Sequence, residues 1–175
     1  MSSARSRSTH PDAVDVIIDQ WKRELPELAS ENMALIGRLR RCSILLAPRL
    51  DEVFAAHDLS NGAFDVLATL RRAGAPYILT PTELFASLMV TSGTMTTRLQ
   101  KVQKRGWVER IPNPDDARSM LVKLTGAGRE LVEKVVFEHV ENERRILEKL
   151  PVETRRQLDA GLAELMRVLE DAKKS

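Results

Sequence analysis

Two short apolar segments separated by a turn-rich stretch constrain the fold of this chain most strongly. Residues 107–111 (WVERI) and 120–124 (MLVKL) have the length and the residue types of short strands. Between them lies the mostly polar sequence PNPDDARS, residues 112–119, in which proline, asparagine and aspartate favour turns. The three segments together predict a β-hairpin.

Three helical segments precede this hairpin. Phe64, Leu67 and Leu70 recur at helical spacing in the first segment. The second begins with the sequence LTPTE (79–83), in which a threonine caps the helix, a proline takes its first position and a glutamate completes a capping box. After a short turn at 90–92, a third helix runs to about residue 106. The order helix, helix, tight turn, helix, hairpin predicts a winged helix-turn-helix. In this motif the helix after the tight turn, here the third segment, enters the major groove of DNA.

The whole chain is expected to be mainly α. Residues 1–9 are rich in Ser and Arg and are expected to form a disordered tail. Residues 10–57 are expected to form N-terminal helices, including an extra first helix with Thr9 as its cap and Pro11 in its first turn. Residues 58–125 are expected to form the winged domain, and residues 126–175 the C-terminal helices. The long terminal helices have more apolar surface than one small domain needs, which favours a homodimer, with packing inside the chain as the alternative.

Charge is distributed unevenly. Between Arg71 and Lys123 the sequence has nine Lys or Arg against four Asp or Glu. This excess predicts a polyanionic partner, unless the cations cluster on a solvated surface by chance. The chain has no apolar run long enough to span a membrane. Its N-terminus is basic but is not followed by an apolar region, and the chain has one cysteine. We therefore expect a cytoplasmic protein that does not contact membranes.

Enzymatic chemistry is not expected. The sequence has no glycine-rich phosphate loop, no zinc-ligand spacing and no Ser/His/Asp grouping, and its three histidines lie in different segments. We therefore predict no catalytic residues, no metal site and no cofactor.

The third helix of the winged domain has two distinct faces when it is projected at about 100° per residue. Met95, Leu99 and Val102 face the body of the domain, and the opposite side is small and polar. Threonine and glutamine can donate to and accept from base edges, and no acidic residue occurs between 92 and 104, unlike on an ordinary solvent face. The residues predicted to contact DNA from this helix are Ser92, Gly93, Thr96, Thr97, Gln100 and Lys101.

The hairpin adds cations to this surface. Arg110 and Arg118 are predicted to contact DNA, with Arg118 near the tip of the wing, where it can reach a narrow minor groove. Asp116 lies two residues before it and is expected to orient its guanidinium. The alternative is that these are ordinary charges of a surface loop.

Four segments carry a resemblance to a known family. The sequences LTPTEL (79–84), TSGTMTTRL (91–99), GWVER (106–110) and NPDDARS (113–119) resemble the MarR family of bacterial transcription regulators. The similarity extends from about Met33 onward. It implies a homodimer formed by the N- and C-terminal helices, binding to palindromic operators, and a repressor that a small ligand releases from DNA.

A finer resemblance is to the urate-responsive branch of that family, related to PecS-type regulators. It rests on the segment FDVLATLRRAGAPY (64–77) and on an extra N-terminal helix with a tryptophan. The resemblance implies that a small anionic effector (urate, another purine, or a small carboxylate or phenolic compound) binds to Trp21, Asp65, Arg72 and Arg98. Arg98 lies at the edge of the apolar face of its helix and is expected to point toward the body. The alternatives are a core tryptophan and a structural network of ion pairs.

Two other functions remain open. Cys42 lies beside Arg40 and Arg41, so it is either an oxidant sensor or a small buried core residue. A non-specific architectural DNA-binding protein would show weak sequence discrimination and a steep dependence on salt.

Overall fold

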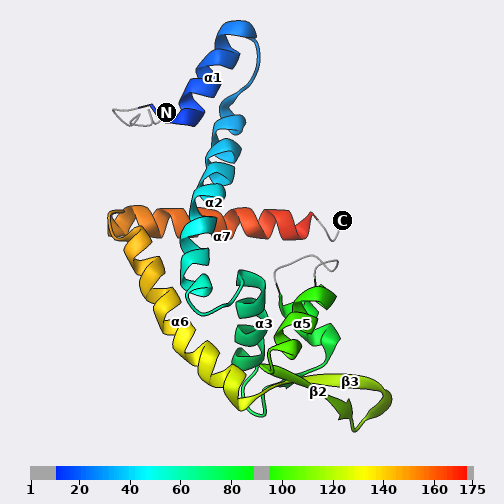
Figure 1. The fold of residues 1–175 in the computed structure, drawn as a ribbon. Coiled ribbons are helices and arrows are strands. Elements are labelled where there is room, and N and C mark those ends of the chain that lie inside the picture. Colours follow the sequence, from blue (N-terminus) through cyan, green and yellow to red (C-terminus); the bar gives the residue numbers. More distant parts are fainter. Residues whose placement is uncertain (1–10, 89–94, 173–175) are drawn as a thin grey trace. The chain divides into compact units, whose positions relative to one another are not determined.

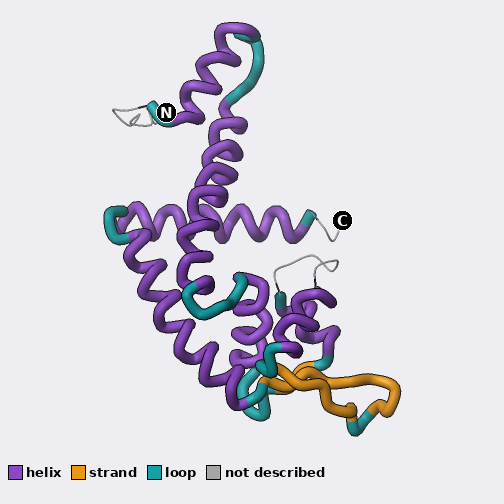
Figure 2. Tube along the Cα trace, in the orientation of Figure 1, coloured by secondary structure: helices purple, strands orange, loops and turns teal. Residues whose placement is uncertain are grey.

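The structure is a computed structural model that describes residues 11–88 and 95–172. It is mainly helical with one small sheet, as Figure 2 shows. The chain forms two compact units, Met1–Arg49 and Leu50–Ser175. The mainly α winged helix-turn-helix fold expected from the sequence is confirmed in the second unit.

The first unit contains helix α1 (Ala13–Glu24) and most of helix α2 (Glu31–Ala55). The predicted helix start at Thr9 is wrong, because Asp12 caps α1 and forms a capping box with Asp15. Val14 and Ile18 are the buried residues of α1. Gly37 permits close packing here, since a Cβ at this position would lie 3.1 Å from Cγ1 of Val14.

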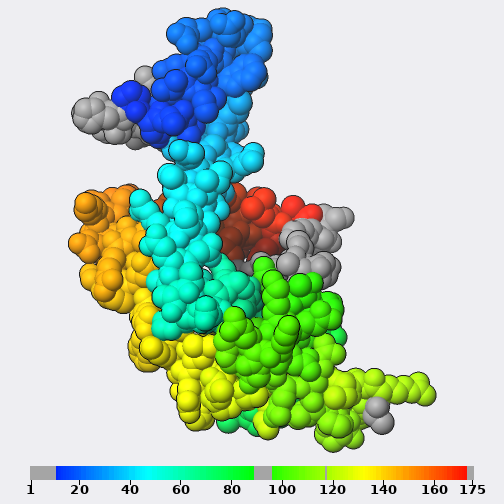
Figure 3. Space-filling view, viewed as in Figure 1, coloured from blue at the N-terminus to red at the C-terminus, as the bar shows by residue number. Residues whose placement is uncertain are grey.

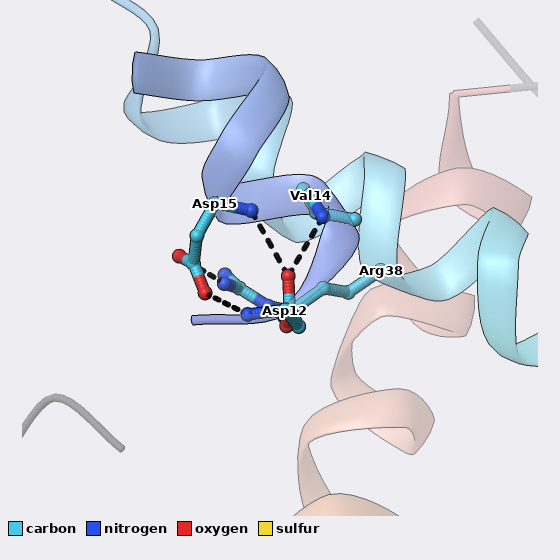
Figure 4. A network of polar contacts seen from close by, with 4 residues as sticks. All are labelled: Asp12, Val14, Asp15 and Arg38. Atoms are coloured by element: carbon cyan, nitrogen blue, oxygen red, sulfur yellow. Dashed lines mark hydrogen bonds and ion pairs between the residues drawn. The ribbon is translucent and has the colours of Figure 1, made fainter. Parts of the chain in front are cut away.

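Arg38 of α2 joins both carboxylates at the start of α1 (Figure 4). Its Nε lies 2.8 Å from Oδ2 of Asp12, and its Nη2 lies 2.5 Å from Oδ1 of Asp15. The hydrogen bond from Arg38 holds the pKa of Asp12 at about 2, well below its ordinary value. A charged network therefore fastens the extra helix α1 to α2.

The second unit carries the three helices of the winged domain. Helix α3 (Asn61–Arg72) is capped by Ser60, helix α4 (Pro81–Ser87) by Thr80, and helix α5 (Met95–Lys104) follows the undescribed residues 89–94. The predicted capping box of Thr80 and Glu83 is confirmed, and it lowers the pKa of Glu83 through the backbone N–H of Thr80. The core that joins these helices contains Phe54 and Phe64 and many buried aliphatic side chains, including Val66, Leu67, Leu70, Leu84, Leu99, Val102, Val122 and Val135.

The sheet has three antiparallel strands in the order β1-β3-β2. β1 is Ile78–Leu79, β2 is Val108–Asn113 and β3 is Asp116–Leu124. The predicted hairpin is confirmed and is longer than expected, with Val108 opposite Leu124 and Ile111 opposite Leu121. Strand β1 was not predicted from the sequence. Figure 1 shows the hairpin extending beyond α3 and α5.

Two long helices follow the hairpin. Helix α6 (Gly126–Leu147) is capped by Thr125 and contributes Val132 and Val135 to the core. Helix α7 (Val152–Asp171) has no buried residue. Within the described ranges, no helix is both long and apolar enough to cross a membrane.

Candidate nucleic-acid interface

Helix α5 divides into a buried and an exposed side. Leu99 and Val102 are buried in the core, as the helical projection predicted; the side chain of Met95 lies outside the described part of the structure. The polar residues predicted to read DNA are exposed: Thr96, Thr97, Gln100 and Lys101. Ser92 and Gly93 lie outside the described residues. The described part of α5 thus presents a polar surface with no acidic side chain.

The wing positions its two predicted arginines differently. Arg110 lies on β2 opposite Val122, and Arg118 lies on β3 near the hairpin turn; both are exposed. The expectation that Asp116 orients the guanidinium of Arg118 is wrong, because Oδ1 of Asp116 accepts a hydrogen bond of 3.0 Å from the backbone N–H of Arg118. A short polar side chain two residues away reaches the backbone more readily than the end of a long arginine.

Side-chain hydrogen bonds hold the turn of the wing. Nδ2 of Asn113 donates to Oγ of Ser119 at 2.8 Å, and Oδ1 of Asn113 accepts from the backbone N–H of Asp115 at 3.1 Å. Lys123, at the other end of β3, pairs with Glu109 at 3.0 Å. The wing therefore presents Arg118 from an ordered turn, while part of the charge at its base is neutralised.

Arg98 leaves the exposed face of α5 and lies over the start of α3. A Cβ at position 62 would overlap the guanidinium and would lie 2.7 Å from Cδ of Arg98. The arginine side chain therefore occupies space that only glycine leaves open. Its Nη1 is buried without a hydrogen-bond partner and lies 3.6 Å from Oδ2 of Asp65, which is a long contact for an ion pair. The inward direction predicted for Arg98 is what the structure shows.

Asp65 is the anionic partner of this arginine. Burial raises the pKa of its carboxyl group, although the charges of Arg98, Arg72 and His139 act in the opposite direction. Arg72 donates from Nη2 to Oγ1 of Thr69 at 3.0 Å. Asp65, Arg72 and Arg98 thus belong to one charged cluster in the second unit, in which the Asp65 carboxylate is only partly compensated.

Trp21 belongs to the first unit, where the residue is 40% exposed. Cys42 also lies in that unit and is exposed, so its interpretation as a buried core residue is wrong.

Two residues beside the charged cluster were not predicted from the sequence. Gly62 carries no periodic or charge signal, and only the path of Arg98 shows its role. His139 of α6 lies 5.0 Å from the ring of Phe54 and 5.3 Å from that of Phe64, between ring centroids. Its Nδ1 is buried without a hydrogen-bond partner. A polar nitrogen in an aromatic surrounding can be found only from the structure.

The described residues hold no group of His, Cys, Asp or Glu arranged to bind a metal ion. What the site offers is an exposed polar helix, a wing with two arginines and an adjoining charged cluster. These are the components of a surface that recognises a polyanion.

Comparisons with known proteins agree with this geometry. The sequence profile of the MarR family matches residues 57–119. The chain is 44% identical over 149 residues to the transcriptional regulator PecS of Dickeya dadantii, an alignment that covers 85% of this chain and 90% of PecS.

Solved structures show the same architecture. A MarR-like transcription regulator from Bacillus cereus aligns with a TM-score of 0.72 and 26% identity, over 81% of this chain and 99% of that one. A MarR variant from Escherichia coli, solved in complex with operator DNA, aligns with a TM-score of 0.67 and 29% identity, over 79% of this chain and 99% of that one. These relatives are transcriptional regulators and not enzymes, in agreement with the expectation from the sequence.

Proposed function

Because this chain belongs to the MarR family of transcriptional regulators, and to its PecS-like branch, we propose that it is a homodimeric repressor of a palindromic operator that a small anionic ligand releases from DNA. The observation that carries the DNA-binding part is the exposed face of α5, where Thr96, Thr97, Gln100 and Lys101 form a surface without an acidic side chain. Such side chains can approach base edges closely and exchange hydrogen bonds with them.

A two-fold dimer explains how one short helix achieves sequence specificity. Two copies of α5 about one turn of DNA apart, roughly 34–36 Å, read two half-sites in inverted orientation. Helix α7 supports the dimer, because Leu158, Leu162 and Met166 are exposed in the single chain. A second copy would cover this apolar surface.

Selection from a random duplex library with the full-length protein tests the DNA-binding part. We expect enrichment of an inverted repeat whose half-sites lie about 10 base pairs apart, centre to centre. Replacing Gln100 by Ala is expected to relax the preference at one position of each half-site, by about 1–3 kcal/mol. Gln157→Ala on α7 is the matched control. Retention of duplexes without any common sequence would instead identify an architectural DNA-binding protein.

The ligand part of the proposal rests on the partly compensated pair of Asp65 and Arg98. An anionic ligand that takes the place of the Asp65 carboxylate would form charge-assisted hydrogen bonds with Arg98, whose Nη1 has no hydrogen-bond partner. Arg98 is part of α5, so its movement would shift the helix that reads DNA. Coupling of this kind typically corresponds to a difference of about 1–3 kcal/mol in ligand affinity between the DNA-binding position of α5 and its shifted position.

Titration of the protein–DNA complex with urate, and then with small aromatic carboxylates, tests the ligand part. Asp65→Ala and Arg98→Gln are expected to weaken release of the DNA, whereas Glu130→Ala, which removes an exposed carboxylate of α6, should leave it unchanged. Full ligand release in both cluster variants would overturn the proposed site. Trp21 stays a prediction from the resemblance, and Trp21→Ala is measured in the same assay.

A further inference from the structure

A hollow of about 540 Å³ lies between the start of α3 and the end of α5. In Figure 3 the teal surface at the start of α3 meets the green surface of α5. A second hollow, of about 380 Å³, shares Leu59, Ser60 and Lys101 with the first. We call the two together the α3–α5 groove.

The α3–α5 groove carries an excess of positive charge at the end of α5. Lys101, Lys104 and Arg105 line its larger part, against the single carboxylate of Asp58. In the part of the chain that the structure describes, none of these three cations has an acidic oxygen within 4.0 Å. Arg105 instead lies over the ring of Trp107, with 5.6 Å between Cζ and the ring centroid. The larger part of the groove is thus a cationic surface, whereas Asp51 and Arg98, which line the smaller part, carry opposite charges.

The spacing of these cations forms a line. Residues three and four positions apart lie on the same side of a helix, so Lys104, the last residue of α5, and Arg105, directly after it, follow Lys101 along one side of the chain. They extend over about 6 Å of the helix axis. One strand of duplex DNA presents a phosphate about every 3.4 Å of its length, so this edge has the dimensions of two neighbouring phosphates.

The start of α3 faces the same groove. Asn61 and Gly62, in the first turn of α3, line its smaller part together with Asp51 and Arg98, and Gly62 is buried beneath the Arg98 guanidinium. Lys101 lines both parts of the groove and also belongs to the exposed face of α5 predicted to read DNA. The groove is therefore continuous with that face.

We propose that the α3–α5 groove is a second DNA-contacting surface, which binds the phosphate backbone beside the major groove through Lys104 and Arg105. The inference rests on the proposed DNA-binding function and adds residues that read no base. Phosphate contacts fix the position of a protein on the duplex and supply affinity that is independent of sequence. The groove then binds the phosphate backbone, and the exposed face of α5 distinguishes the bases.

The salt dependence of binding tests this surface without knowledge of the operator. The full-length protein is titrated with a random-sequence 30-base-pair duplex at several salt concentrations, and the double variant Lys104→Gln, Arg105→Gln is compared with it. Loss of two phosphate contacts is expected to reduce the slope of log K against log salt by about 1.8 per bound chain, and to weaken binding at 0.1 M salt by at least about tenfold.

Two controls separate this effect from misfolding and from a general loss of charge. Lys134→Gln, Lys149→Gln removes two exposed cations of the same unit that do not line the groove, and should leave the slope nearly unchanged. Lys104→Arg, Arg105→Lys keeps both charges and should keep the slope. Both expectations require a melting temperature like that of the parent protein, measured by circular dichroism.

Three outcomes would overturn the proposal. A slope unchanged in Lys104→Gln, Arg105→Gln means that the groove does not contact phosphates, although the proposed function stands. An equal reduction in both neutralised double variants means that only net charge matters. A parent protein that does not bind the duplex at all overturns the proposed DNA-binding function together with this surface.

Discussion

The contact between Gly62 and Arg98 is the most specific arrangement at the scale of single residues. A glycine within the first turn of a helix has a cost, because it has more freedom to lose on folding than alanine. Here the missing Cβ leaves the space in which the Arg98 guanidinium lies. The residue that links α5 to α3 therefore depends on a neighbour that has no side chain.

Gly62→Ala is expected to displace Arg98 from α3 without unfolding the domain, since alanine suits a helix better than glycine. The added methyl group would overlap the guanidinium, which is the mobile end of a long side chain. DNA binding should persist, and ligand release should weaken about as much as in Arg98→Gln. Gly126→Ala is the control, because a Cβ at that position meets nothing within 4 Å. Normal release by Gly62→Ala would contradict this role.

Asp65→Asn is expected to raise the melting temperature at pH 7. Burial raises the pKa of Asp65 in the folded state above its ordinary value of 3.8. A raised carboxyl pKa means that stability falls as the pH rises through this range, because the folded state holds the proton more tightly. The gain from the asparagine should therefore disappear below about pH 3.8. Thermal melts of both proteins between pH 3 and 8 measure it, and a lower melting temperature at pH 7 would refute it.

At the scale of elements, α1 depends on the network of Arg38 with two aspartates. Exposed ion pairs contribute little individually, but this one joins two carboxylates at the end of a helix. Asp12 is also the cap of α1, accepting hydrogen bonds from the backbone N–H groups of Val14 and Asp15. The same carboxylate thus caps the start of α1 and binds it to α2 through Arg38.

Arg38→Gln is expected to loosen α1 selectively, with faster hydrogen exchange of its amides and little change in the second unit. The pH dependence follows from Asp12, whose pKa is lowered to about 2 from 3.8. A lowered pKa gives stability that is present above pH 3.8 and is lost as the pH falls toward 2. Arg23→Gln on α1 serves as the control. Equal exchange in the parent and in Arg38→Gln would contradict the expected role of the network.

The elements that the sequence predicted well are those with strong local signals. The capping box of Thr80 and Glu83 and the paired strands of the wing depend on residues near one another in the chain. Strand β1 was missed because Ile78 and Leu79 are too few to show a period and pair with the distant β3. The start of α1 was misplaced because threonine and aspartate are both good caps, and Arg38, which binds the Asp12 carboxylate, lies 26 residues further along the chain.

The candidate site shows the same limit. The projection of α5 predicted the buried Leu99 and the inward Arg98, because a helix fixes the direction of its side chains. Gly62 and His139 were not identified, since their significance arises only from contacts between α3, α5 and α6. Asp116 was assigned the wrong partner because the sequence does not distinguish a backbone donor from a side-chain donor.

At the scale of the whole molecule, the C-terminal helix α7 packs none of its side chains into the core of the single chain. Helix α7 buries none of its residues in the single chain, and Phe137 and Val140 of α6 are also exposed. Large apolar side chains exposed on two helices favour an interface when they form one patch. The proposed dimer would therefore contribute a large part of the stability of α7.

Leu162→Glu is expected to shift the protein toward monomers at micromolar concentration, because a carboxylate in a dimer interface would be buried without a partner. The melting temperature of the parent should rise with protein concentration, whereas that of the variant should be lower and depend on concentration less. Sedimentation velocity and melts at several concentrations measure both effects. Gln157→Glu adds a negative charge at an exposed polar position and is the control. An unchanged dimer in Leu162→Glu would exclude this surface as the interface.

The overlap between a Cβ at position 62 and the guanidinium of Arg98 also bears on how related chains diverge. A chain that acquires a side chain at position 62 loses the room for an arginine folded back from position 98. A chain that shortens residue 98 no longer needs the glycine. We therefore expect the two positions to be exchanged as a pair among relatives, although 36 residues separate them in the sequence. A regulator in which α5 alone is replaced by that of a distant relative should fit poorly against α3 until position 62 is replaced as well.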